Sequence, residues 1–285
     1  MSDKHVAYPD EEKGHDCVDK KTENGACLKG HEGAYKKRSC SYRWQAHEVS
    51  KLERKDVYHN YLDNIKKSHK DDGGIPTMRY ETKSGGQAPW YYTSKLNLPE
   101  EGHWDLDGPK QSFRRNGIVK VKKGKNFTKD HWPYWHNAHH LIPKALLNNT
   151  ILNELEENSH LCRGALLSVK YNINHKVNMI ILPQDKEVAA ILNLPRHLVL
   201  KEPGRTPQCT NHAAYTDTVE TELLNIINGY KKIVDKAAEE NHESPKPELD
   251  KIKLETLSKD CYQTILDFGK TSPGEPIDDI PEITG

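Results

Sequence analysis

Apolar residues are concentrated in one part of this chain, and their distribution limits where a packed core can form. Residues 140–230 contain most of the leucine, isoleucine and valine, whereas residues 1–125 are rich in lysine, aspartate, glycine and histidine. Only 34% of the 285 residues are hydrophobic, which is a lean supply for this length. We therefore expect one compact domain with loosely packed or extended flanks.

Periodicity predicts mostly helices around a few short strands. Apolar residues recur at helical spacing, and the breaks fall at DDGG, Pro183, Pro195 and SPKP. The sequence GIVKVKKG alternates apolar and basic residues, as a half-exposed strand or hairpin arm does. These patterns favour an α+β fold. We expect helices over about 45–70, 143–158, 185–194, 211–240 and 247–269, and extended segments ending at Pro143 and Pro183.

The distribution of charge indicates one local basic surface on a chain that has no net charge. The chain has 42 basic and 42 acidic residues, so any attraction for nucleic acid must be local. Residues 114–129 carry seven positive charges and no acid, which makes Lys120, Lys122 and Lys123 candidates for contacting phosphates. The same run is also typical of a solvated hairpin. Residues 271–285 carry only negative charges and many prolines, and we expect a mobile acidic tail there.

The N-terminus and the cysteines bear on location and on metal binding. The sequence has no apolar run of membrane-spanning length, and its first residues lack the apolar core of a secretory signal. We therefore expect synthesis in the cytoplasm, no membrane insertion and, if the protein is exported, a route without a cleavable signal. Cys17, Cys27 and Cys40 lie among histidines, so a structural zinc site there is one alternative to free thiols.

Three pieces in order carry the chemical signal: His139–His140 before LIP, Asn178 before IILP, and His212 ahead of Tyr215. Phosphodiester hydrolysis needs a general base and a cation, and imidazole can serve as the base or as a ligand. Adjacent side chains on an extended segment point to opposite sides. One histidine of the pair can therefore hold a metal while the other faces the scissile phosphate, and an asparagine can pin the connecting loop.

The segments NAHHLIP, NMIILP and HAAYTDTV resemble the AHH family of the HNH/endonuclease VII superfamily, over about residues 131–227. The resemblance implies a ββα-metal centre within a mainly helical domain, beside an irregular N-terminal region. It also implies roles for individual residues. His139 and His212 would be metal ligands, His140 the general base and Asn178 the orienting asparagine.

One departure from the family pattern leaves the third ligand open. Relatives often have a histidine one helical turn before the last one, where this chain has Gln208. His197, Cys209 or a water are the alternatives. Three histidines would favour Zn²⁺ or Ni²⁺, whereas few protein ligands and several waters would favour Mg²⁺. Arg163 is a further candidate for binding the phosphate backbone.

The resemblance further implies the biological setting. Such domains end bacterial polymorphic toxins and interbacterial effectors, so we expect a DNase (RNA being possible), a cognate immunity protein, and type VI-like export to act in a target-cell cytoplasm. We expect a delivery or accessory region over 1–110, the nuclease over 111–270 and the tail over 271–285. Residues from 111 onward would then fold and cleave DNA alone. The alternatives are a restriction or phage-type HNH nuclease and a non-enzymatic zinc-binding interaction module.

Overall fold

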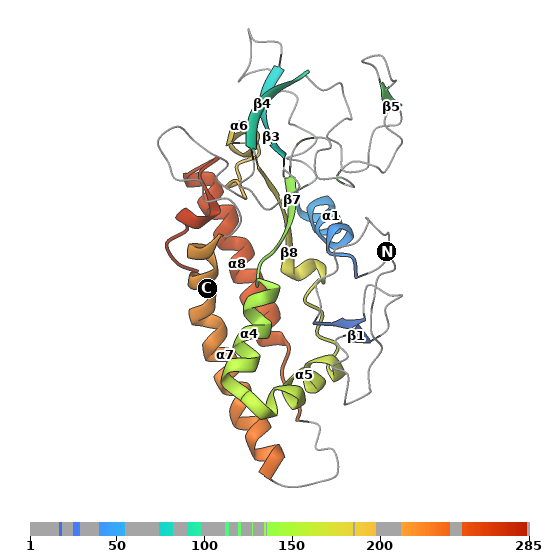
Figure 1. Ribbon diagram of the computed structural model, residues 1–285, viewed down its shortest axis with the longest axis vertical. Helices are drawn as coiled ribbons and strands as arrows, with labels where there is room; N and C mark the ends of the chain where they lie inside the picture. The colour runs from blue at the N-terminus through green and yellow to red at the C-terminus, as the bar shows by residue number, and fades with distance from the viewer. Residues whose placement is uncertain are drawn as a thin grey trace.

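The computed structural model describes a subset of the chain, and every structural statement below concerns that subset. Figure 1 shows a two-stranded sheet in the middle of the molecule, with helix α1 on one side and helices α7 and α8 on the other. Side chains are described at Phe127 and Tyr134 and over 25–28, 40–54, 136–184, 186–197, 212–239 and 247–283; strands at 17–18, 74–81, 90–97, 112–113 and 119–120 are described as backbone.

The described elements make a mixed fold that is mostly helical. Their bounds follow in chain order. They are β1 (Cys17–Val18), β2 (Ala26–Cys27), α1 (Tyr42–Glu53), β3 (Gly74–Glu81), β4 (Trp90–Asn97), β5 (Ser112–Phe113), β6 (Val119–Lys120), β7 (His136–His140), α4 (Lys144–Leu155), η1 (Glu156–Asn158), α5 (Ser159–Ser168), η2 (Lys176–Asn178), β8 (Met179–Pro183), α6 (Lys186–Ile191), α7 (Ala213–Glu239), α8 (Ile252–Thr271) and η3 (Ile277–Asp279).

Most of the expected elements are present after residue 135. The extended segments become β7 and β8, and the four expected helices become α4, α6, α7 and α8. The helix expected over 45–70 begins earlier, at Tyr42, and α1 ends at Glu53; residues 55–70 lie outside the described residues. The expected hairpin arm is also different, because β6 pairs with β5 in parallel. No helix within the described ranges is long and apolar enough to cross a membrane.

Strands β7 and β8 form the antiparallel pair that carries the histidines. Their register sets His136 opposite Pro183 and His140 opposite Met179. All five residues of β8 are buried, as expected for a strand covered on both faces. In β7 only His136 and His139 are fully buried, so this strand lies closer to the surface.

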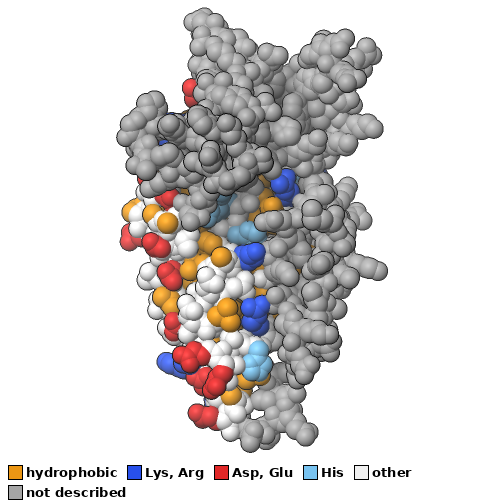
Figure 2. All heavy atoms as spheres, viewed as in Figure 1, with side chains coloured by type: hydrophobic (Ala, Val, Ile, Leu, Met, Phe, Trp, Pro, Cys, Tyr) orange, Lys and Arg blue, Asp and Glu red, His pale blue; other side chains and the backbone are white. Residues whose placement is uncertain are grey.

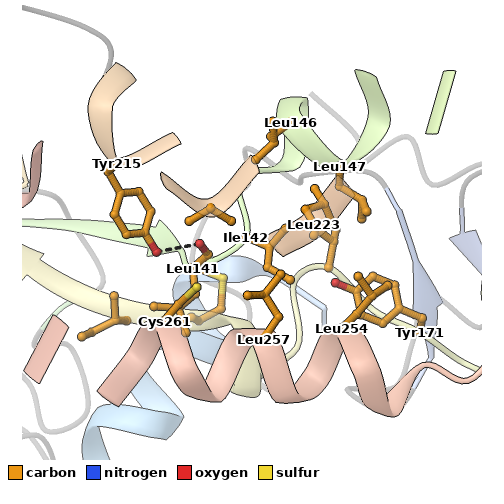
Figure 3. Packing of buried hydrophobic residues seen from close by; sticks show 14 of the residues in the cluster. Leu141, Ile142, Leu146, Leu147, Tyr171, Tyr215, Leu223, Leu254, Leu257 and Cys261 are labelled. Atoms are coloured by element: carbon orange, nitrogen blue, oxygen red, sulfur yellow. Dashed lines mark hydrogen bonds between the residues drawn. The ribbon is translucent and has the colours of Figure 1, made fainter. Parts of the chain in front are cut away.

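The core joins the end of β7 to the long C-terminal helices. Leu141 and Ile142 follow the histidine pair and pack with Leu223 of α7 and Leu257 of α8 (Figure 3). The Tyr215 hydroxyl donates a 2.7 Å hydrogen bond to the Leu141 carbonyl in the same cluster. Packing against α7 and α8 therefore fixes the position of the residues that follow the histidine pair, because burial of these apolar side chains supplies the main stabilising free energy.

Two described pieces of the N-terminal region, β2 and α1, pack against elements that follow the expected boundary at residue 110. Strand β2 continues the core by exchanging hydrogen bonds with 171–173, at 2.9 Å from Cys27 N to the Tyr171 carbonyl and 2.8 Å from Ile173 N to the Cys27 carbonyl. Helix α1 packs on β7 and β8, and Trp44 is 5% exposed. Among the described residues of this region, α1 covers the sheet with buried apolar side chains such as Trp44, which composition alone did not indicate.

Described residues of the C-terminal segment, for which the sequence predicts a mobile acidic tail, pack against the core. Ile277 and Ile280 are buried in the core. Backbone hydrogen bonds join Arg196 N to the Glu275 carbonyl at 2.9 Å and Ile277 N to the Arg196 carbonyl at 3.0 Å. These contacts order residues 272–283 against the loop that leads to His197, and only residues 284–285 of the tail lie outside the described part.

Gly269 of α8 allows the helix to approach that same loop closely. A Cβ at this position would lie 2.5 Å from the Asn193 carbonyl oxygen and 2.7 Å from the Leu194 Cα. We expect Gly269→Ala to destabilise the protein by about 1–3 kcal/mol, the usual range for overpacking. Chemical denaturation measures the change. Gly229, which has open space around its α-hydrogens, is the matched control, and equal effects of alanine at both sites would contradict the close-packing argument.

Candidate functional site

Three histidines from distant parts of the chain meet beside the sheet. His139 lies on β7, His197 follows α6, and His212 immediately precedes α7. Their ring centroids are separated by 4.9 Å (His139–His197), 4.7 Å (His139–His212) and 5.0 Å (His197–His212). One possible metal-ligand atom from each histidine lies within 4.8 Å of the other two. Among the described residues, this is the group of three or more His, Cys, Asp or Glu side chains that could hold a metal ion.

This spacing is close to that of a bound metal ion. Nitrogen ligands lie about 2.0–2.1 Å from Zn²⁺, so two ligands of one ion are separated by at most about 4.2 Å. Small side-chain rotations would therefore bring all three nitrogens into range. The sequence left the third ligand open, and among the described residues His197 occupies that place; Gln208 and Cys209 lie outside them.

Backbone hydrogen bonds hold each ligand segment. His197 N donates to the Pro183 carbonyl at 2.7 Å, which ties the loop after α6 to the end of β8. The His212 carbonyl accepts from Thr216 N at 3.0 Å and so begins the first turn of α7. His139 is held by its pairing with Ile180 in the sheet.

The hydrogen bonds of the cluster are incomplete in a way that suits a cation. His139 Nδ1 and His197 Nε2 lie 3.0 Å apart, and Asn137 Nδ2 donates to His197 Nδ1 at 3.2 Å. Because Nδ1 of His197 accepts the hydrogen bond from Asn137, the proton of the neutral His197 ring is on Nε2. Nε2 of His139 and Nδ1 of His212 are buried without a hydrogen-bond partner among the described residues. Buried polar atoms of this kind are costly unless something satisfies them, and a metal ion is the natural partner for imidazole nitrogens.

Burial keeps the three rings neutral, which is the form that binds metals. Burial lowers the pKa of His197 to about 3, and the charge of His212 adds to the shift. Burial likewise lowers the pKa of His139, followed by the charges of its neighbouring histidines. For His212, burial also lowers the pKa, while Asp278 opposes the shift.

His140 points away from this cluster, as alternation along a strand predicts. Its ring lies 5.5 Å from the ring of Tyr42 on α1. Its Nε2 lies 2.9 Å from Oδ1 of Asn174. A carbonyl oxygen only accepts, so Nε2 carries the proton. Nδ1 is then the basic nitrogen, and it forms no hydrogen bond with the part of the chain that the structure describes. Burial lowers the pKa of His140 to about 4, with the Asn174 hydrogen bond opposing this shift.

Asn174 is the residue that holds His140, and sequence reasoning missed it. Its side chain is fully buried. Its amide nitrogen lies 3.5 Å from the Cys27 sulfur, and its backbone nitrogen donates to Asn172 Oδ1 at 2.9 Å. The sequence NINHKVN gives no periodic signal for this role, since the contact depends on how 171–175 folds against β2.

Asn178 pins the loop after the histidine pair and does not touch His140. Its Oδ1 accepts from Ile142 N at 2.8 Å, and its Nδ2 donates to the Ile173 carbonyl at 2.8 Å. Ser258 of α8 also donates to Oδ1, at 2.9 Å. The side chain therefore joins β7, the 173 loop and α8, which is the loop-pinning geometry expected for an orienting asparagine.

The predicted phosphate contacts fall in different places. Lys122 and Lys123 lie outside the described residues, and Lys120 is described only as backbone in β6. Arg163 lies on α5, where its Nη1 donates to Asn148 Oδ1 of α4 at 3.2 Å.

The N-terminal cysteines form a smaller cluster. Cys27 and Cys40 are buried and in contact with one another, and Cys17 is the strand partner of Cys27. The side chains of Cys17, His15 and His31 lie outside the described residues. His47 packs instead with Trp44 and Phe127, at ring distances of 5.7 and 6.4 Å. The described residues therefore leave the zinc alternative for this region as a prediction.

Asp278 is a second site neighbour that the sequence did not indicate. Its Oδ1 accepts from Tyr215 N at 3.1 Å, in the first turn of α7. A carboxylate at a helix N-terminus is stabilising there because it satisfies free N–H groups. Burial raises the pKa of the Asp278 carboxyl, while the hydrogen bond from Tyr215 N and the charge of His212 oppose the rise.

The chain shows no established relative: no protein-family model matches it, and searches of curated proteins and of solved structures returned no significant match.

Proposed function

We propose that this protein is a metal-dependent endonuclease of the HNH type that hydrolyses phosphodiester bonds of DNA. One observation carries the proposal. A cluster of three imidazoles includes His139, and the next residue at the end of β7, His140, is held separately by Asn174. A metal site beside an oriented base is the pairing that phosphodiester hydrolysis requires.

His139, His197 and His212 would hold the metal ion in this proposal. Bound there, a divalent cation would supply charge stabilisation for the phosphate and the leaving oxygen. Three neutral imidazoles favour Zn²⁺ or Ni²⁺ over Mg²⁺, which prefers oxygen ligands. Strands β7 and β8 followed by α7 would then correspond to the ββα-metal motif, with α4 and α5 inserted between the strands.

His140 would act as the general base through Nδ1, and Asn174 would fix the ring. Asn137 would support the ligand set. A metal on Nε2 of His197 leaves the proton on Nδ1, which needs an acceptor. Rotation of the Asn137 amide by half a turn presents Oδ1 to that nitrogen at the position now held by Nδ2.

The toxin setting is the biological part of the proposal. An enzyme of this kind endangers the cell that makes it, so a cognate immunity protein and export by a signal-independent, type VI-like route are the partners we propose. A restriction or phage-type nuclease shares the same chemistry and is distinguished by its neighbouring genes.

The deciding experiment is incubation of the purified full chain with supercoiled plasmid in Zn²⁺, Ni²⁺, Mn²⁺ or Mg²⁺, with and without EDTA. We expect nicking that requires metal and stops with EDTA. A protein that binds the metal tightly but leaves the plasmid intact under all four conditions is instead the non-enzymatic zinc-binding module.

Removal of a ligand histidine gives a test that is independent of cleavage. We expect His197→Ala or His212→Ala to weaken Zn²⁺ binding at least about tenfold, the lower end of the range for losing support at a metal site. Isothermal titration on the full chain measures it. The control is His160→Ala, an exposed histidine on α5 that lies outside the cluster. Wild-type affinity in both ligand variants would remove them from the set.

A further inference from the structure

Basic side chains follow one another from α1 past His140 into α4. The Arg43 guanidinium lies 5.9 Å from the centre of the Tyr42 ring, and the Tyr42 ring lies 5.5 Å from His140. Lys144, the first residue of α4, also lies near His140, close enough for its charge to act on the His140 imidazole.

The same line continues from α4 to α5. Asn148 Nδ2 donates to the Lys144 carbonyl at 3.0 Å, and Arg163 donates to Asn148 Oδ1 at 3.2 Å. Arg43, Lys144 and Arg163 are all partly exposed. We call these three residues the basic track; Lys144 and, through Tyr42, Arg43 both lie near His140.

Acidic side chains are concentrated elsewhere. Figure 2 shows Lys, Arg and His side chains following one another along the middle of the molecule, while Asp and Glu gather along one side. Lys144 forms no ion pair with any residue that the structure describes. A chain with no net charge therefore presents a local basic surface next to the candidate base.

We propose that the phosphate backbone of a nucleic acid strand lies along the basic track, with the scissile phosphate at His140 and its neighbours at Lys144 and Arg163. This inference rests on the proposed function, since it places the substrate of that site. Lys144 and Asn148 are one helical turn apart, a rise of about 6 Å. Lys144 and the Arg163–Asn148 pair are therefore far enough apart to contact different phosphates of one strand.

The test measures binding separately from cleavage. A short labelled DNA duplex is titrated with the full-length, metal-loaded protein in a His140→Ala background, across a range of salt concentrations. Lys144→Gln and Arg163→Gln are compared singly and together. The matched control is Lys232→Gln, because Lys232 is exposed on α7 between the buried Tyr230 and Val234. Thermal melting confirms that each variant is folded.

Each basic-track variant is expected to reduce the slope of log K against log salt by about 0.9, and the double variant by about 1.8. Lys232→Gln keeps the wild-type slope. A wild-type slope in the double variant overturns the inference, and so does an equal loss in the control. The two proposals fail separately. If the protein with His140 intact cleaves DNA but the basic-track variants keep the wild-type salt slope, the basic track is wrong and the nuclease proposal stands. If the basic-track variants reduce the slope but the protein with His140 intact never cleaves DNA, the basic track stands and the nuclease proposal is wrong.

Discussion

His140→Ala is expected to reduce plasmid cleavage by at least about a hundredfold, the usual scale for losing a positioned general base. Metal affinity is expected to stay at the wild-type value, because His140 faces Asn174 and Tyr42 and not the three-histidine cluster. Plasmid nicking gives the rate, and isothermal titration with Zn²⁺ gives the affinity.

This combination separates a base from a ligand. A ligand variant loses metal binding and activity together, whereas a base variant loses activity alone. His160→Ala on α5 serves again as the control, since it removes an exposed histidine without touching either group. Cleavage at the wild-type rate by His140→Ala would show that another group activates the water.

Removing residues 1–110 is expected to abolish cooperative folding and, with it, nuclease activity. The fragment 111–285 lacks β2 and α1, and with them Leu28, Trp44 and Val49, which are 0, 5 and 5% exposed. Burying three such side chains contributes about 5–9 kcal/mol at about 1.5–3 kcal/mol each. That is comparable to the whole net stability of a domain, about 5–15 kcal/mol.

Polar contacts strengthen this expectation. Arg54 at the end of α1 donates to the Leu192 carbonyl at 2.7 Å, and Gln45 accepts from Lys176 N at 2.9 Å. Both partners would be left unsatisfied in the fragment. Circular dichroism during urea denaturation measures the loss of cooperativity.

Mixing separately purified 1–110 with 111–285 provides the control, because the missing strand and helix can then bind in trans. Recovery of a cooperative transition on mixing supports the shared core. A fragment 111–285 that unfolds cooperatively and cleaves plasmid alone would restore the two-part architecture that composition suggested.

Local patterns predicted much of the framework because they depend on neighbouring residues. The period of apolar positions in α7 and α8 follows from helix geometry, and the opposite directions of His139 and His140 follow from strand geometry. The two most useful site residues besides the pair, Asn174 and His197, depend on tertiary packing. His197 reaches His139 only because the loop after α6 bonds to the end of β8.

Composition did not indicate the packed residues near the two ends of the chain, for a common reason. Composition averages over a segment, whereas a core needs only a few apolar side chains at the right places. Trp44 on α1 and Ile277 in the acidic tail are such residues, each buried within a mainly polar stretch. Isolated apolar residues that cover a core change the average composition of their segment very little.

The long sequence separations within the site have a consequence for the order of synthesis. His212 follows His139 by 73 residues (212 − 139), and the Ser258 and Asp278 contacts that brace Asn178 and α7 come later still. The chain leaves the ribosome from its N-terminus. A nascent chain therefore carries His140 long before it carries the helices that set it in place. The proposed chemistry would become available only once the segment to residue 283 has been synthesised. An inhibitor that binds only the folded protein could therefore bind it as soon as it folds.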